Sequence, residues 1–151
     1  MSAKPAYRLV RVPASSRDLA WLDAECFPED SPEPKAGADW WVVRLAGVGP
    51  VAFAGVRYWP SDDCGYLCRA GVVPDHRGHG LQARLIRARL RHATKEGWSA
   101  CYTYTSPENI HSANNLIRAG FTLWDPRRAW GGESMLYWWR SCEPHPGRAS
   151  R

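Results

Sequence analysis

The feature that most constrains this chain is a glycine turn between a strand pattern and a helix pattern. The turn is Val72-Val73-Pro74-Asp75-His76-Arg77-Gly78-His79-Gly80-Leu81-Gln82, and an amphipathic pattern begins at its second glycine. Gly78 and Gly80 have no Cβ, so the backbone there can adopt positive φ and lie close to a ligand. The first amides of a helix lack partners within it, and the helix dipole favours negative charge at that end. We therefore expect an anion site that suits a pyrophosphate, with a plain strand-to-helix connection as the alternative.

A second segment follows the strand pattern of residues 100–105. Residues 106–121 predict a short helix that ends at Gly120, a residue type that suits the C′ position. Asn109 stands between the strand and the helix, and its side-chain amide can both donate and accept a hydrogen bond. It can therefore cap the helix, bind an amide of a ligand, or do both.

Together the two segments resemble the GCN5-related N-acetyltransferase superfamily. The first family motif is V-x-P-x-x-R-G-x-G-x-G/A, the acyl-CoA pyrophosphate loop, and the second is N-x-x-A/S-x-x-L-Y-x-x-x-G-F. The first motif is matched here by Val72, Pro74, Arg77, Gly78 and Gly80, and the second by Asn109, Ser112, Gly120 and Phe121.

The resemblance implies an acetyl-CoA-dependent N-acetyltransferase that moves an acetyl group to a primary amine by direct attack, with acetyl-CoA as co-substrate. Ser112 is the expected acid for the CoA thiolate, by resemblance to relatives that acetylate ribosomal protein N-termini, and Glu25 is the expected base. Capping of the helix is the alternative role for Ser112, and an ordinary exposed carboxylate is the alternative for Glu25. The residues expected to bind the cofactor are Val72, Val73, Arg77, Gly78, His79, Gly80, Leu81, Gln82 and Asn109.

Three departures from the family pattern support a competing hypothesis. Gln82 stands where the family has Gly or Ala, and Leu116 stands where many relatives carry a Tyr that protonates the thiolate. The strand at residues 65–73 has no carboxylate, although many relatives carry a Glu there. The alternative is therefore a catalytically silent CoA-binding module with this fold, used for regulation or interaction. If the chain is active, Tyr104 and Tyr137 are the other candidates for the acid.

The order of periodic segments predicts an α/β (α+β) fold. We expect a mixed, mostly antiparallel central sheet of six to seven strands with helices on both faces, the acyl-CoA N-acyltransferase fold that the resemblance also implies. Residues 1–151 are expected to form a single domain with flexible ends at 1–6 and 143–151. The expected strands are 7–12, 40–45, 50–58, 65–73, 100–105 and a final pair around 121–124 and 134–139, and the main helices are 17–27, 81–96 and the helix of the second motif.

Composition excludes several classes of protein. No apolar run approaches a membrane span or a signal peptide, so a cytoplasmic protein without a membrane partner is expected. The five cysteines show no zinc-ligand spacing, and we expect neither a metal nor a disulfide. The net charge of +5 allows a nucleic-acid-binding domain, with Arg84, Arg87 and Arg91 on one helix face, as a less favoured hypothesis.

The acceptor is not identified by these motifs. In the family its pocket corresponds to residues 23–38 and 125–134, and either a small-molecule amine or a protein or peptide amine would suit the reaction. An acidic cluster favours a cationic acceptor, whereas Arg127 and Arg128 favour an acceptor with an anionic group. The acidic cluster comprises Asp23, Glu25, Glu29, Asp30 and Glu33. The nine Trp residues are expected to pack in the core or between the copies of a homodimer, with ligand stacking as the alternative.

Overall fold

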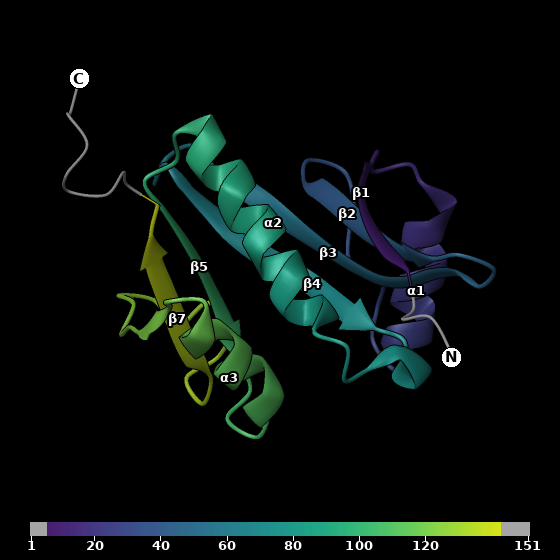
Figure 1. Ribbon diagram of the computed structural model, residues 1–151. Coiled ribbons are helices and arrows are strands. Elements are labelled where there is room, and N and C mark those ends of the chain that lie inside the picture. The colour runs from purple at the N-terminus through teal and green to yellow at the C-terminus, as the bar shows by residue number, and fades with distance from the viewer. Residues whose placement is uncertain (1–5, 143–151) are drawn as a thin grey trace. The chain divides into compact units, whose positions relative to one another are not determined.

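The computed structural model describes residues 6–142, and the expected flexible ends lie outside this range except for Ala6. The described chain forms seven strands, three α-helices and one 3-10 turn (Figure 1). In chain order these are β1 (Tyr7–Val12), α1 (Arg17–Cys26), β2 (Asp39–Leu45), β3 (Gly49–Trp59), β4 (Cys64–Val72), η1 (Pro74–His76), α2 (Leu81–Glu96), β5 (Ala100–Thr105), α3 (Ile110–Arg118), β6 (Thr122–Leu123) and β7 (Leu136–Ser141).

The strands form one open, mostly antiparallel sheet in the order β1-β2-β3-β4-β5-β7-β6. The parallel pair is β4 with β5, as a helical crossover through α2 requires. The predicted fold class is thereby confirmed. The described chain divides into two compact units, one of residues 6–57 and 68–85 and the other of residues 58–67 and 86–142.

The first unit has a core of apolar side chains from β2, β3 and α1. Strand β1 pairs with β2 from Tyr7 opposite Leu45 to Val12 opposite Trp40. The indole of Trp40 stacks on Phe53 at 6.1 Å between ring centroids, and both side chains are fully buried. Gly55 lies against this indole, where a Cβ would come within 2.6 Å of the ring, so the close packing requires glycine. Helix α1 buries Leu19 and Leu22 at helical spacing.

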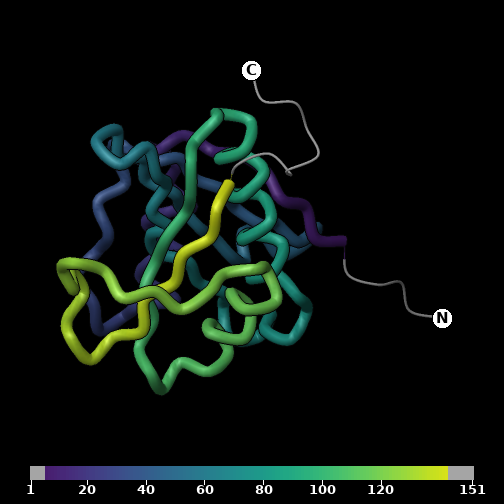
Figure 2. The backbone as a smooth tube through the Cα atoms, turned by 90° about the vertical axis from the view of Figure 1, so that its left-hand side faces the viewer, coloured from purple at the N-terminus to yellow at the C-terminus, as the bar shows by residue number. Residues whose placement is uncertain are grey.

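The second unit is built on the antiparallel pair of β5 and β7, which run side by side in Figure 2. Their register places Tyr104 opposite Tyr137 and Thr103 opposite Trp138. Trp138 is buried, as are Trp40 and Trp41 of the first unit, which confirms core packing for these three residues. Trp139 lies outside the core, because 38% of its surface is exposed, and packing between copies of a homodimer stays a prediction for this residue.

Candidate cofactor and active site

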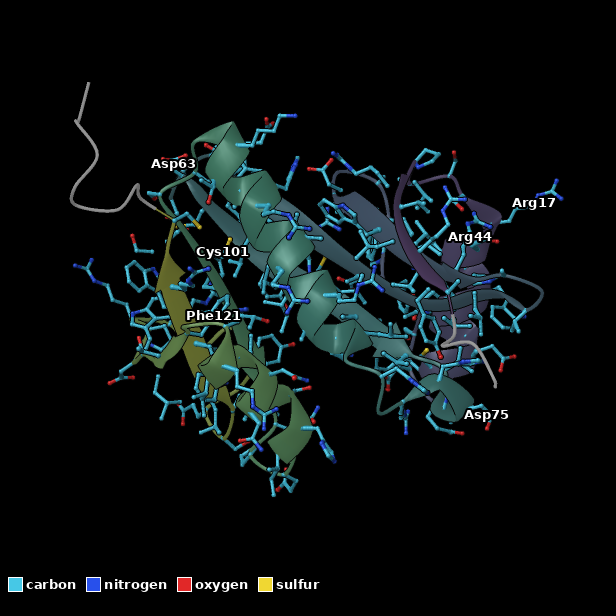
Figure 3. The ribbon with its side chains drawn as sticks, in the orientation of Figure 1. Arg17, Arg44, Asp63, Asp75, Cys101 and Phe121 are labelled. Atoms are coloured by element: carbon cyan, nitrogen blue, oxygen red, sulfur yellow. The ribbon has the colours of Figure 1, made fainter. Side chains whose placement is uncertain are left out.

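A glycine loop joins β4 to α2 in the first unit. Pro74 opens η1, since its fixed φ suits the start of a helical turn. The side chain of Asp75 projects outward from this turn (Figure 3). Gly78 and Gly80 have φ values of +83° and +72°, which confirms the conformation expected of them. A Cβ at either glycine would meet no heavy atom within 4 Å, so the space over the loop is open to a ligand.

The backbone amides of this loop form a row of unused donors. No acceptor in the described part of the chain receives a hydrogen bond from any of the amides of residues 78–83. The carbonyl of Gly80 accepts from the amide of Arg84 at 3.1 Å, so helical bonding begins at Gly80 and residues 81–83 form the first turn of α2. Amides in such a turn, aligned with the helix dipole, attract an anion.

The two valines before the loop have main-chain groups with different roles. The amide of Val73 donates to the carbonyl of Val51 on β3 at 2.8 Å, and the carbonyl of Val73 accepts from the amide of His76. The carbonyl of Val72 accepts from Nε of Arg77 at 3.4 Å. Because successive amides of a strand point to opposite sides, the amide of Val72 faces away from β3. It is therefore the main-chain donor of this pair that an extended ligand could use.

Tyr7 on β1 supports the loop, a contact that the sequence did not indicate. Its hydroxyl lies 3.1 Å from Nδ1 of His76, and its ring centroid lies 5.3 Å from that of His79. Arg84 donates from Nη1 to the carbonyl of Tyr7 at 3.3 Å. Tyr7 is 69 residues away from His76, and no local pattern marks such a contact. Strand β1 therefore contacts the loop through Tyr7, and the basic side chains of His76, His79 and Arg84 lie around that contact.

In the second unit, the structure brings Asn109 and Ser112 together at the start of α3. Asn109 is the N-cap, and its Oδ1 accepts from the amide of Ser112 at 3.2 Å. This confirms the capping role of Asn109 and leaves its NH₂ group as a donor. The half-buried hydroxyl of Ser112 has no hydrogen-bond partner among the residues that the structure describes.

The other candidates for an acid differ in availability. Leu116 is buried on α3 and offers no proton, as its side chain dictates. The hydroxyl of Tyr137 accepts from the amide of Gly131 at 2.9 Å and donates to the carbonyl of Gly132 at 2.7 Å. The hydroxyl proton of Tyr137 is therefore used in a hydrogen bond within the turn before β7 and is not available to a ligand. Ser112 and Tyr104 remain as candidates.

Glu25 lies exposed near the end of α1, and the next residue, Cys26, packs on Gly71 of β4. A Cβ on Gly71 would come within 2.9 Å of the Cys26 sulfur. Burial raises the pKa of Cys26 to about 11, although the charge of Arg77 opposes the shift. The thiol is therefore neutral near pH 7 and is a poor nucleophile.

The expected acidic cluster on this side of the first unit is partly neutralised within the protein. Asp23 is buried, with only 2% of its surface exposed, and contacts both Lys35 and Arg69. Arg69 also lies 3.7 Å from Asp30. Asp23 follows Leu19 and Leu22 on the inward face of α1, a position that could have indicated its burial. Asp23 is thus removed from the set of carboxylates that could contact an acceptor directly.

Two wider features bear on the expected chemistry. Residues 6–142 contain no cluster of three or more His, Cys, Asp or Glu side chains placed to hold a metal ion. Within the same range, no helix has the length and apolar character needed to cross a membrane.

Comparison with known proteins identifies a matching family model and similar folds. The model of the acetyltransferase (GNAT) family matches residues 7–121. No curated protein matches the chain at a significant level. Many solved structures share the fold, at sequence identities that support the fold alone.

Three of these structures illustrate the range. The IAA acetyltransferase from Bacillus cereus is 12% identical with a TM-score of 0.74, over 90% of this chain and 99% of that one. The ribosomal-protein-S18-alanine N-acetyltransferase from Escherichia coli is 14% identical with a TM-score of 0.74, over 97% and 100%. An acetyltransferase from Bacillus subtilis in complex with CoA is 13% identical with a TM-score of 0.71, over 90% and 99%.

Proposed function

Since the chain belongs to the acetyltransferase (GNAT) family, we propose that it transfers an acetyl group from acetyl-CoA to a primary amine. The observation that carries this proposal is the row of unused amides at residues 78–83, beneath the open space at Gly78 and Gly80. A pyrophosphate needs several donors close together, and consecutive amides of this loop supply them without requiring a side chain. The CoA complex of the Bacillus subtilis relative agrees with this choice of cofactor.

The cofactor-binding residues divide between the two units, and each is assigned within its own unit. In the first, the amides of residues 78–83, including Gln82, bind the pyrophosphate, with Arg77 and His79 adding positive or polar side chains. The amide of Val72 is the donor for an amide carbonyl of the pantetheine arm. In the second, Asn109 caps α3 with its oxygen and offers its NH₂ group to the pantetheine arm.

The catalytic proposal uses two residues that transfer protons and no covalent enzyme intermediate. Acetyl-CoA supplies the thioester that the amine attacks. Glu25 accepts the proton that the acceptor ammonium must lose, directly or through water. As the C–S bond breaks, Ser112 donates its hydroxyl proton to the departing sulfur and accepts the proton that the acylated nitrogen must lose, so its hydroxyl is restored. The neutral thiol of Cys26 is a poor nucleophile, which agrees with direct attack by the amine.

A catalytically silent CoA-binding module is the second candidate, and specific observations favour it. Leu116 replaces the usual acid, and the middle of β4 carries Arg69, which is paired with Asp23 and cannot act as a base. This candidate requires the same loop to bind CoA. The two candidates therefore differ only in turnover.

One experiment separates the candidates. The thermal midpoint is measured with and without millimolar CoA, and CoA release from acetyl-CoA is followed with a thiol reagent. The acceptors are spermidine, kanamycin and a peptide with an N-terminal alanine, the last chosen because one structural neighbour is named a ribosomal-protein-S18-alanine N-acetyltransferase. A raised midpoint with CoA release supports the acetyltransferase, and a raised midpoint without release from a broad amine panel supports the silent module. No shift in the midpoint would rule out both.

Ser112 is tested in the same assay. Ser112→Ala should lower kcat by roughly 10²- to 10⁴-fold, with little change in acetyl-CoA affinity, because an acid acts as charge develops on sulfur. Turnover at the wild-type rate would limit Ser112 to a place in the first turn of α3, and Tyr104 would become the leading candidate.

A further inference from the structure

Asp23 forms a charged centre inside the first unit. Its carboxylate accepts three hydrogen bonds, from Nζ of Lys35 at 2.5 Å, from Nη1 of Arg69 at 2.9 Å and from the amide of Glu33 at 3.0 Å. Only 3% of the side chain is exposed. A carboxylate this deeply buried is tolerated when charge and hydrogen bonds are both satisfied, and here they are.

Two of these three bonds come from the segment that follows α1. This segment, residues 28–38, contains three prolines and forms neither a helix nor a strand. Lys35 and Glu33 belong to it, and Nζ of Lys35 also donates to the carbonyl of Glu33 at 2.5 Å. The Asp23 carboxylate on α1 therefore binds both a main-chain amide of the segment, that of Glu33, and a side chain of the segment, that of Lys35.

Arg69 extends the same centre to strand β4. Its Nη1 donates to the carbonyl of Ser31 at 3.0 Å as well as to Asp23, and its guanidinium lies 4.6 Å from the ring centroid of Phe27. Contacts with both the Asp23 carboxylate and the Phe27 ring therefore fix the position of the Arg69 guanidinium. The segment is thus tied to the strand that carries the glycine loop at its end.

Further bonds hold the same segment from β2 and β3. Arg57 donates to the carbonyls of Pro34 and Ala36, each at 2.9 Å, and Nε1 of Trp40 donates to the carbonyl of Lys35 at 2.8 Å. A segment without secondary structure normally leaves its main-chain groups to water. In residues 28–38, side chains of the sheet donate hydrogen bonds to main-chain carbonyls, so the segment is held in a fixed position. We refer to this fixed segment as the wall.

We infer that Asp23 is a positioning residue that fixes the segment of residues 28–38 as a preformed wall for the amine acceptor. The inference rests on the proposed function and on the expectation from the sequence that residues 23–38 form part of the acceptor pocket. Asp23 acts through Lys35 and Arg69 and touches neither the acceptor nor the cofactor. A preformed wall saves the ordering that binding would otherwise require, so its loss weakens acceptor binding more than it slows chemistry.

The test removes the charged centre and measures the segment and the acceptor separately. Asp23→Asn alone leaves two cations facing a neutral group and risks misfolding, so Asp23→Asn is also combined with Lys35→Met, which removes opposite charges together. Asp18→Asn is the matched control, because Asp18 lies on the same helix but pairs with Arg44 of β2 and not with a residue of the segment. Hydrogen exchange is followed in peptides covering residues 28–37. Initial rates are measured with whichever of spermidine, kanamycin and the alanine peptide is acetylated.

The expected result is faster exchange in the segment and an acceptor KM raised about tenfold or more in the double variant, with acetyl-CoA KM and kcat changed far less. The control should match the wild type in all four measurements. If the double variant exchanges hydrogen in the segment as slowly as the wild type, the inference is wrong. It is also wrong if exchange is faster but the acceptor KM is unchanged. Neither result contradicts the proposed function. Failure of the wild-type protein to release CoA with any acceptor overturns the proposed function, and the inference with it.

Discussion

The hydroxyl of Thr103 on β5 donates a 2.9 Å hydrogen bond to the main-chain carbonyl of Leu67 on β4, and both residues are buried. The bond lies one residue beyond the pairing of Tyr66 with Tyr102, where the parallel ladder ends. A side chain thus takes the place of a backbone donor.

The first prediction concerns this bond. Thr103→Val keeps the shape of the side chain but leaves the buried carbonyl of Leu67 without its donor, which should cost about 1–3 kcal/mol of unfolding free energy. Thr103→Ser keeps the hydroxyl and should retain most of the bond, at the expense of one buried methyl group. Urea denaturation measures both. Equal stability of the valine variant and the wild type would show that the hydroxyl contributes nothing there.

The glycine loop gives the second prediction. Gly80→Val should abolish the rise in thermal midpoint caused by CoA, because a branched side chain at φ +72° strains the loop and fills the open space above it. Gly47 is a matched control with φ +79° and no heavy atom within 4 Å of its ideal Cβ, in the turn between β2 and β3. Gly47→Val should suffer similar strain and keep the CoA effect. If both variants lost the rise in thermal midpoint with CoA, the loss would be due to general destabilisation and not to the glycine loop.

Gln82 is the departure from the family pattern that is easiest to test. If its side chain merely crowds the phosphates, Gln82→Ala should bind CoA as tightly as the wild type or more tightly. If its amide donates to a phosphate oxygen, the same change should weaken binding by about 1.5–3 kcal/mol, the contribution of a hydrogen bond to a charged group. We expect the first result, since residues 81–83 retain their backbone amides in either case. Titration calorimetry with CoA decides between them.

Much of the fold could be predicted because it depends on local patterns. Strands β1 and β5 and helix α2 have the predicted bounds, since alternation or helical spacing ends there at Pro, Gly or Ser. The final strands were predicted less well. Strand β7 begins at Leu136, two residues later than expected, and runs on to Ser141, because its register with β5 places Ser141 opposite Ala100. That register depends on a distant partner strand.

In the candidate site too, features that depend on neighbouring residues could be predicted, whereas contacts between distant residues could not. Gly78 and Gly80 have the expected positive φ, and Asn109 caps its helix, which is one of its two predicted roles, since each of these features depends on immediate neighbours. The role of Asp23 could not be predicted, because Lys35 and Arg69 lie 12 and 46 residues away from it. Sequence composition suggested a carboxylate cluster facing an acceptor, whereas the tertiary fold turns one member inward.

Asn109 has two roles that substitution can separate. Asn109→Ala removes both the N-cap and the NH₂ donor, so it should cost about 0.5–2 kcal/mol of stability and also raise the KM for acetyl-CoA. Asn109→Asp keeps a capping oxygen and removes only the donor, so stability should be preserved while the KM still rises. Thermal unfolding and initial rates measure the two effects. An unchanged KM in the aspartate variant would restrict Asn109 to capping.

The last prediction concerns the dependence of stability on pH. Burial raises the pKa of Asp23, but the hydrogen bonds from Lys35, Arg69 and the amide of Glu33 outweigh it, so the pKa lies below its usual value of 3.8. A lowered pKa stabilises the folded state above the pKa of the unfolded chain, and this contribution is lost as pH falls through the folded value. Asp23→Asn should therefore be less stable than the wild type by about 3–5 kcal/mol near neutral pH, with the difference shrinking in strong acid. Asp18→Asn, which breaks a partly exposed pair, should lose about 1 kcal/mol or less at any pH. Urea denaturation of the three proteins from neutral pH into acid tests the sign, and a gap between Asp23→Asn and the wild type that is constant with pH would contradict it.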